Sequence, residues 1–236
     1  MNNSLIIYFV IALFSFAFTA CGGTSATQEN EQATTANTET VNPKQTMTKN
    51  TKEKKRIIFF GDSLTAGYGL DEQDAYPSLI QQMLDSLGLA YQAVNAGLSG
   101  ETTAGGVNRI NWVAEQPMDI FVLELGGNDV LRGFDLAATK ENLQAILDKV
   151  KSKYPDIQLV IAGMEAPPNM GPEYADEFRT IFRQLAADND AALIPFLLAD
   201  VGGIPELNLA DRVHPNQAGH KIVAQTVWEV IEPLLD

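Results

Sequence analysis

From residue 56 to the end of the chain, short runs of β-branched and aromatic residues alternate with longer segments of helical periodicity. This alternation is typical of a parallel sheet covered by helices on both faces. The sequence predicts strands over 56–61, 91–95, 119–124, 158–162 and 192–195, and helices over 76–87, 104–115, 139–153, 173–189 and 216–234. We therefore expect a single three-layer α/β/α domain with about five parallel strands.

In such a sheet, ligands bind outside the carboxyl ends of the strands, where the connecting loops converge. Three expected strand ends, and the loop before the last expected helix, carry short polar or glycine-rich blocks. These read G-D-S-L at 61–64, N-A-G-L-S-G-E-T at 95–102, G-G-N-D at 126–129 and D-R-V-H-P-N at 211–216. The sequence thus predicts a site at this edge of the sheet.

The first and last blocks carry groups suited to nucleophilic catalysis. On its tight, glycine-flanked turn, Ser63 can act as a nucleophile, or it can cap the helix that follows. Asp211 stands three residues before His214, so it can accept the Nδ1–H of the imidazole and leave Nε2 to take a serine proton. His220 falls inside the last expected helix, where we predict that it faces solvent and has no role.

The second and third blocks carry groups that can donate hydrogen bonds without charge. Glycine lets a backbone N–H approach a ligand closely, and an asparagine amide such as Asn128 supplies further donors. Both blocks fit an oxyanion hole, and both also fit ordinary turns, in which Gly, Asn and Asp satisfy backbone requirements.

Composition excludes several classes of function. The formal net charge of −14 has the wrong sign for a protein that binds nucleic acid through phosphate neutralisation. One cysteine and two histidines cannot form a four-ligand Cys/His zinc site, and a single cysteine cannot form an internal disulfide. We therefore expect no such metal site and no nucleic-acid partner.

The amino-terminal 55 residues differ in composition from the rest of the chain. Residues 5–20 form an uncharged, apolar run that is short for a membrane span and fits a signal peptide, although a buried cysteine in a core helix is the alternative. The small residues before Cys21 resemble a bacterial lipobox, which implies removal of 1–20 and acylation of Cys21. We read 21–55 as a flexible tether because it holds too few apolar residues to form a core. The expected location is therefore outside the cytoplasm, on a bacterial membrane, facing the periplasm or the exterior.

The four blocks, in their order, resemble the SGNH hydrolases, also called the GDSL esterase/lipase family. The resemblance is closest to a branch of periplasmic thioesterase, lysophospholipase and arylesterase proteins, and it covers about 56–235. It implies a flavodoxin-like fold, with Ser63 as nucleophile, His214 as general base and then acid, and Asp211 as its orienting carboxylate. It further implies that the backbone N–H groups of Ser63 and Gly100 and the side-chain amide of Asn128 form the oxyanion hole. Gly97 is the rival glycine in the second block.

The resemblance implies a serine esterase that hydrolyses carboxylic esters or thioesters through an acyl-enzyme, a mechanism that needs no cofactor. Small esters and lysolipids are the expected substrates, and in the resembling branch loops such as 131–135 and 164–172 line an acyl-chain groove; a lid without substrate contact is the alternative. Two other functions stay open: a carbohydrate acetyl esterase and a non-catalytic binding lipoprotein. We expect a monomeric domain over 56–236.

Overall fold

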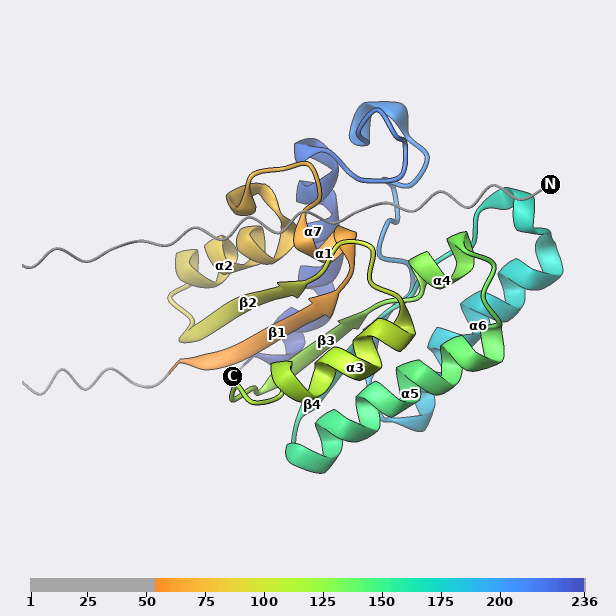
Figure 1. Cartoon of the computed structure of the whole chain (residues 1–236). Coiled ribbons are helices and arrows are strands. Elements are labelled where there is room, and N and C mark those ends of the chain that lie inside the picture. Colours follow the sequence, from red (N-terminus) through yellow and green to blue (C-terminus); the bar gives the residue numbers. More distant parts are fainter. Residues whose placement is uncertain (1–53, 236) are drawn as a thin grey trace, which may run out of the picture. The chain divides into compact units, whose positions relative to one another are not determined.

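The computed structural model describes residues 54–235, which form a three-layer α/β/α domain around one parallel sheet (Figure 1). The strands lie in the order β2-β1-β3-β4-β5, which is the flavodoxin-like order. Their bounds are β1 (Lys55–Gly61), β2 (Tyr91–Gly97), β3 (Ile120–Glu124), β4 (Gln158–Ala162) and β5 (Ala192–Ile194). The predicted fold class and all five predicted strands are confirmed, and β2 runs two residues farther than expected.

The core lies on both faces of the two central strands. In β1 the four consecutive residues from Ile57 to Phe60 are all fully buried, and every residue of β3 is buried. Neighbouring residues of a strand point to opposite faces of the sheet. Burial of every residue in these runs therefore requires a layer of helices on each face. A continuous apolar run, rather than an alternating one, is therefore the pattern that these strands need.

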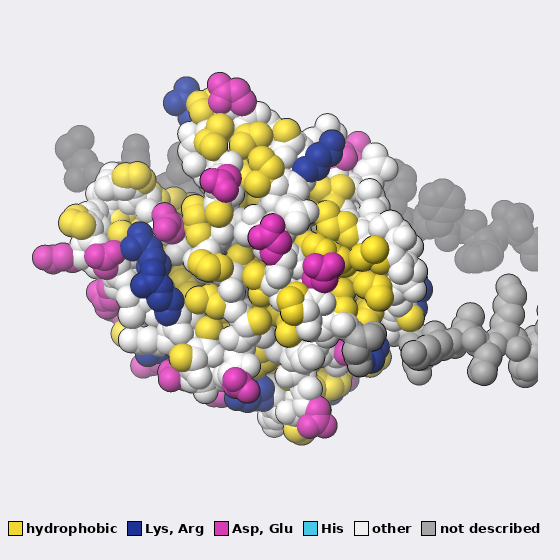
Figure 2. Space-filling view, turned by 180° about the vertical axis from the view of Figure 1, so that it is seen from behind, with side chains coloured by type: hydrophobic (Ala, Val, Ile, Leu, Met, Phe, Trp, Pro, Cys, Tyr) yellow, Lys and Arg dark blue, Asp and Glu magenta, His cyan; other side chains and the backbone are white. Residues whose placement is uncertain are grey.

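Two groups of helices supply those layers. Helices α2 (Tyr76–Ser86) and α7 (Gln217–Ile231) pack against one another, while α5 (Leu136–Lys153) packs against both α3 (Thr103–Val113) and α6 (Pro172–Asp188). In Figure 1, α3 and α5 lie in front of the sheet and α7 lies behind it. Seen from behind, charged side chains of both signs are scattered between apolar patches, and neither sign forms one large field (Figure 2). No helix among residues 54–235 has the length and apolar content that a membrane crossing requires.

Two short helices, each just after the end of a strand, were not predicted from the sequence. They are α1 (Ser63–Ala66) after β1 and α4 (Gly127–Leu131) after β3. Neither is long enough to show helical periodicity, since the first has four residues and the second five. Four short 3₁₀ segments, Glu72–Asp74, Pro168–Met170, Pro205–Leu207 and Glu232–Leu234, complete the connections. The last of them ends the predicted helix 216–234 early, because Pro233 cannot continue α7.

The prediction that His220 faces solvent is wrong. Its side chain is buried, its Nδ1 accepts a hydrogen bond from the backbone N–H of Tyr76 over 3.2 Å, and the two rings are stacked. Tyr76 is the first residue of α2, where the backbone N–H has no partner within the helix. Burial lowers the pKa of His220 to about 4, so the ring is neutral at pH 7 and acts as an acceptor.

Candidate active site

Ser63 is the first residue of α1, one position beyond the residue that caps this helix. The cap is Asp62, whose Oδ1 accepts a hydrogen bond from the backbone N–H of Leu64 over 3.0 Å. Ser63 is therefore not the cap, and that alternative interpretation of the first block is wrong. Gly61 closes β1 at a point where a Cβ would lie 2.8 Å from the backbone carbonyl oxygen of Glu124, so this turn requires glycine.

Ser63, His214 and Asp211 form one hydrogen-bonded line. Ser63 Oγ lies 2.9 Å from His214 Nε2, although 151 residues separate the two in the sequence. On the other side of the ring, His214 Nδ1 lies 2.7 Å from Asp211 Oδ2. With Nδ1–H donating to the carboxylate, Nε2 is the acceptor for the serine hydroxyl.

Asp211 is fixed by the turn in which it stands. Its Oδ1 accepts hydrogen bonds from the backbone N–H groups of His214 and Val213, over 3.0 and 2.9 Å. Arg212 between them takes a left-handed conformation, with φ of 58°. The two backbone hydrogen bonds, followed by the bond to the imidazole, lower the pKa of Asp211 to about 2. The carboxylate that faces His214 is thus ionised at neutral pH.

The two glycines of the second block have different surroundings. Gly97 donates its N–H to Asn95 Oδ1 over 3.0 Å, and a Cβ at Gly97 would lie only 2.2 Å from the backbone nitrogen of Ala66. Gly100 is exposed and left-handed, with φ of 79°, and its carbonyl accepts a hydrogen bond from Arg132 Nη2 over 3.0 Å. Gly97 thus serves the packing of β2 on α1, which favours Gly100 as the oxyanion donor.

Asn128 is the second residue of α4, which is preceded by the left-handed Gly126 at its cap. Its Nδ2 donates to Asp62 Oδ2 over 2.9 Å. Since an amide nitrogen carries two hydrogens, this bond orients the side chain and leaves a second donor. The neighbouring Asp129 accepts hydrogen bonds from the N–H and Oγ1 of Thr103, over 2.9 and 2.5 Å, which ties the third block to α3.

Two buried carboxyl groups, which the sequence analysis missed, lie under the nucleophile turn. Glu124, at the end of β3, accepts hydrogen bonds at Oε2 from the N–H of Asp62 over 3.0 Å and from Thr65 Oγ1 over 2.8 Å. Burial, reinforced by the nearby Asp62 charge, raises the pKa of Glu124 well above its usual range. Burial also raises the pKa of Asp62, against its hydrogen bonds from Leu64 and Asn128. An acidic residue that closes an otherwise apolar strand is the signal that could have identified Glu124.

The remaining contacts at this edge involve an aromatic ring. Tyr68 follows α1, and its ring centroid lies 4.5 Å from that of His214.

Among residues 54–235, no cluster of three or more His, Cys, Asp or Glu side chains is arranged to hold a metal ion. The arrangement supports attack by a serine hydroxyl, with a histidine to take its proton and uncharged donors on the neighbouring loops.

The predicted residues Ser63, Asp211, His214, Gly100 and Asn128 all lie on the loops and short helices that end at this edge of the sheet. Ser63, His214 and Asp211 are in direct contact, and Asn128 is joined to the nucleophile turn through Asp62. Cys21 lies outside the described residues.

Comparison with known proteins agrees with this geometry. The model of the GDSL-like Lipase/Acylhydrolase family matches residues 59–222. The chain is 37% identical to Esterase TesA of Pseudomonas aeruginosa, over 76% of this chain and 89% of that protein. It is 33% identical to Thioesterase 1/protease 1/lysophospholipase L1 of Escherichia coli K12, over 76% of this chain and 85% of that one.

A solved structure supports the same relationship at the level of the fold. The crystal structure of TesA superposes with a TM-score of 0.73 and 36% identity, and the match covers 77% of this chain and all of that one. Both blocks that carry the Ser63–His214 contact fall inside the family match. The chain therefore belongs to the GDSL-like lipase/acylhydrolase family, the SGNH hydrolases, and is a carboxylic ester hydrolase.

Proposed function

We propose that Ser63, His214 and Asp211 are the catalytic triad of this esterase. The observation that carries the proposal is the line from Ser63 Oγ to His214 Nε2, at 2.9 Å, and from His214 Nδ1 to Asp211 Oδ2, at 2.7 Å. As Ser63 Oγ attacks the ester carbonyl, its proton passes to His214 Nε2. The ionised Asp211 holds the ring in the required tautomer and stabilises the imidazolium that forms.

The negative charge that develops on the carbonyl oxygen needs donors that are already in place. We assign this role to the backbone N–H groups of Ser63 and Gly100 and to the Asn128 side chain. The bond between Asn128 Nδ2 and Asp62 Oδ2 supports the assignment, because it fixes the amide before substrate binds. Collapse of the tetrahedral intermediate passes the proton from His214 to the leaving group. Water, activated in turn by His214, then hydrolyses the acyl-enzyme.

We propose lysophospholipids and acyl thioesters as the substrate class. The names of the Escherichia coli and Pseudomonas aeruginosa relatives point to esters and thioesters. Next to the proposed oxyanion donors, Leu131 and Phe134 expose apolar side chains that an acyl chain can contact. An enzyme that deacetylates carbohydrates would instead need a short, polar acyl pocket at this position.

Hydrolysis of p-nitrophenyl esters with two to twelve acyl carbons tests both assignments. The Ser63→Ala variant removes the proposed nucleophile. Ser86→Ala is the matched control, because Ser86 is exposed at the last position of α2 and bonds only to the carbonyl of Met83 among the described contacts. We expect loss of at least about 10³-fold in kcat for Ser63→Ala and no change for Ser86→Ala.

The dependence on chain length separates the substrate classes. A maximum at medium or long acyl chains supports the lysolipid and thioester assignment. Turnover of acetate and butyrate alone would assign the enzyme to short esters, including acetylated carbohydrates. If Ser63→Ala hydrolysed every ester at the wild-type rate, the proposed nucleophile would be wrong.

We further propose that residues 1–20 are an export signal, that Cys21 is acylated, and that 21–55 tether the hydrolase domain to a bacterial membrane. The support is the sequence alone: an uncharged apolar run, two small residues before Cys21, and a polar segment after it. Expression in bacteria fed an alkynyl fatty acid tests the proposal. We expect label on the wild-type protein and none on Cys21→Ser; equal labelling of both would contradict it.

A further inference from the structure

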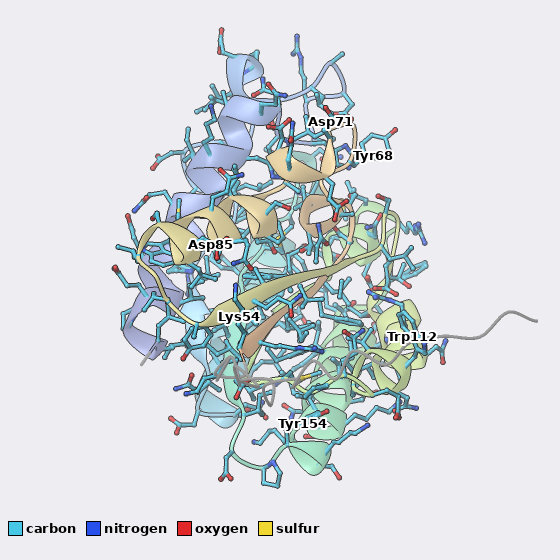
Figure 3. The ribbon with its side chains drawn as sticks, turned by 90° about the vertical axis from the view of Figure 1, so that its left-hand side faces the viewer. Lys54, Tyr68, Asp71, Asp85, Trp112 and Tyr154 are labelled. Carbon is cyan, nitrogen blue, oxygen red and sulfur yellow. The ribbon has the colours of Figure 1, made fainter. Side chains whose placement is uncertain are left out.

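The exposed large hydrophobic side chains of residues 54–235 are unevenly distributed. Six of the eight belong to the carboxyl edge of the sheet, five in loops and Leu131 at the end of α4, and we call this set the apolar rim. It consists of Tyr68, Leu98, Leu131, Phe134, Ile204 and Val213, which are between 38% and 59% exposed. The other two, Leu87 and Trp112, lie at the ends of α2 and α3, which run back toward the opposite edge. Figure 3 shows Tyr68 and Trp112 well apart on the molecule.

Several residues of the apolar rim lie beside the proposed catalytic residues. Val213 precedes His214, and Leu98 stands two residues before Gly100. The Tyr68 ring packs against the His214 ring at 4.5 Å and is still half exposed. These rim side chains therefore lie beside the proposed catalytic groups and contribute little to the core. Concentration of exposed apolar groups on one face is the property that marks an interaction surface.

The charges within the rim favour an electrically neutral partner. Arg132 and Arg212 adjoin rim residues, but Asp135 adjoins Phe134 as well, and Glu206 and Asp211 stand two residues from Ile204 and Val213, so charges of both signs are present. A highly basic or acidic partner would meet repulsion as well as attraction at this face. An apolar or zwitterionic surface meets neither.

The position at which the chain enters the domain is compatible with a membrane as that partner. The described chain begins at Lys54, beside the start of β1, whereas Tyr68 of the rim follows the other end of this strand (Figure 3). A seven-residue strand spans about 23 Å. A flexible segment of about 33 residues, as proposed for the tether, has an r.m.s. reach of about 30 Å. Such a tether is long enough for the rim to face the membrane in which the chain is anchored.

We propose that the apolar rim is a lipid-facing surface, which seats the domain on a zwitterionic lipid interface with the active-site entrance toward the lipid. This proposal rests on the proposed function, because a lysolipid substrate lies in such an interface. Insertion of the rim would let the substrate move to Ser63 without crossing water.

Sedimentation with phosphatidylcholine vesicles tests the proposal on residues 54–236. This part is suitable because the solved relative, matched over its whole length, consists of this domain alone. The test variant is the double substitution Leu98→Ser and Ile204→Ser, at two rim residues outside the proposed catalytic groups. The matched control is Leu87→Ser with Trp112→Ser, which removes an even more exposed apolar pair from the opposite edge.

We expect the wild-type domain to bind the vesicles, the rim variant to bind at least tenfold more weakly, and the control to bind like wild type. Binding should persist at 0.5 M salt, because apolar contact is not screened. Both variants should hydrolyse p-nitrophenyl acetate, which is dissolved in water, within about twofold of the wild-type rate. Absence of wild-type binding, or equal weakening in the control pair, would overturn the proposal.

Two further measurements separate this proposal from its alternatives. Ser63→Ala should bind vesicles like wild type, so vesicle binding and the esterase assignment can fail independently. Size-exclusion chromatography reports whether the rim instead joins two copies of the chain. A concentration-dependent dimer that the rim variant abolishes, without vesicle binding, would assign the surface to self-association and contradict the lipid proposal.

Discussion

At the scale of single residues, Asn128 shows how the site is prepared before substrate arrives. One of its amide hydrogens is donated to Asp62 Oδ2 over 2.9 Å, which sets the direction of the other. We expect Asn128→Ala to lower kcat about 10²- to 10³-fold with KM within a few-fold, because the lost donor acts on the transition state. Steady-state kinetics on p-nitrophenyl butyrate measures this.

The control for Asn128 is Asn142→Ala. That asparagine is also partly buried and donates to Thr103 Oγ1, but it lies on α5. Its loss should leave kcat unchanged within about twofold. A rate for Asn128→Ala close to that of Asn142→Ala would remove Asn128 from the oxyanion hole.

The ionised state of Asp211 permits a prediction at neutral pH. Its pKa of about 2 lies below the ordinary value of 3.8, so the carboxylate stays ionised down to about pH 3. Asp211→Asn keeps the size of the side chain but presents a donor to His214, which favours the wrong tautomer. We expect a loss of kcat of about 10⁴-fold at pH 7, measured on the same ester. An unchanged rate would mean that the carboxylate does not orient the histidine.

At the residue scale, the order of residue types in the sequence indicated which side chains would meet, but it did not indicate which titratable side chains would be buried. Ser63, Asp211 and His214 were identified from short blocks, and the structure brings them into contact. Glu124 and His220 were missed because nothing in a linear sequence states that a charged or titratable side chain will be enclosed. Both serve hydrogen bonds whose partners come from distant segments.

At the scale of secondary-structure elements, the approach of β2 to α1 depends on one glycine. A Cβ at Gly97 would lie 2.2 Å from the nitrogen and 2.8 Å from the Cα of Ala66, both backbone atoms that cannot rotate away. Gly97→Ala should therefore push α1, and Ser63 with it, away from His214. We expect at least a tenfold loss of kcat and about 1–3 kcal/mol lower free energy of unfolding.

Gly88→Ala is the control for this prediction. Gly88 has a φ of 67° in the turn before β2, and a Cβ at this position would meet no atom within 4 Å. Alanine there costs about 1–2 kcal/mol through backbone conformation alone. Urea unfolding and ester hydrolysis of both variants separate the two effects, because only Gly97→Ala should alter kcat. Equal kcat in the two would show that the contact with Ala66 does not position Ser63.

Prediction of the elements was accurate for long segments and failed for single turns. The apolar strand cores and the amphipathic helices showed clear periodicity, and all were found. The short helix α4 had no periodicity to detect, and its start depends on Gly126 in a left-handed conformation. The start of α5 at Leu136, three residues before the predicted one, follows from Asp135, whose side chain caps the helix through the N–H of Ala138.

At the scale of the whole molecule, two buried groups give opposite dependences of stability on pH. The folded-state pKa of His220 lies at about 4, below its ordinary 6.5, so its contribution is present above pH 6.5 and is lost as pH falls toward 4. The pKa of Glu124 is raised above its ordinary 4.5, so its contribution is present below pH 4.5 and is lost as pH rises through its folded-state value. Between pH 4.5 and 6.5, His220 therefore makes the free energy of unfolding rise with pH, whereas Glu124 makes it fall.

When one of the two groups is substituted, the free energy of unfolding should show the pH dependence that the other group causes. We expect the free energy of unfolding of Glu124→Gln to rise with pH between 4.5 and 6.5 more steeply than that of wild type, by up to about 1.4 kcal/mol per pH unit. His220→Asn, which keeps an acceptor for Tyr76, should fall with pH over the same range. Urea denaturation at four pH values measures both. Parallel curves for all three proteins would show that neither group is perturbed by folding.

The distance along the chain between Ser63 and His214 also concerns the order of folding. Asp211 and His214 share one turn and can meet as soon as that turn forms, whereas the serine is 151 residues away and directly follows the first strand. We expect contacts between such distant segments to form late, because closing a longer loop costs more conformational entropy. During refolding, ester hydrolysis should therefore recover no earlier than the slowest structural signal. Recovery of esterase activity would then mark the completion of folding.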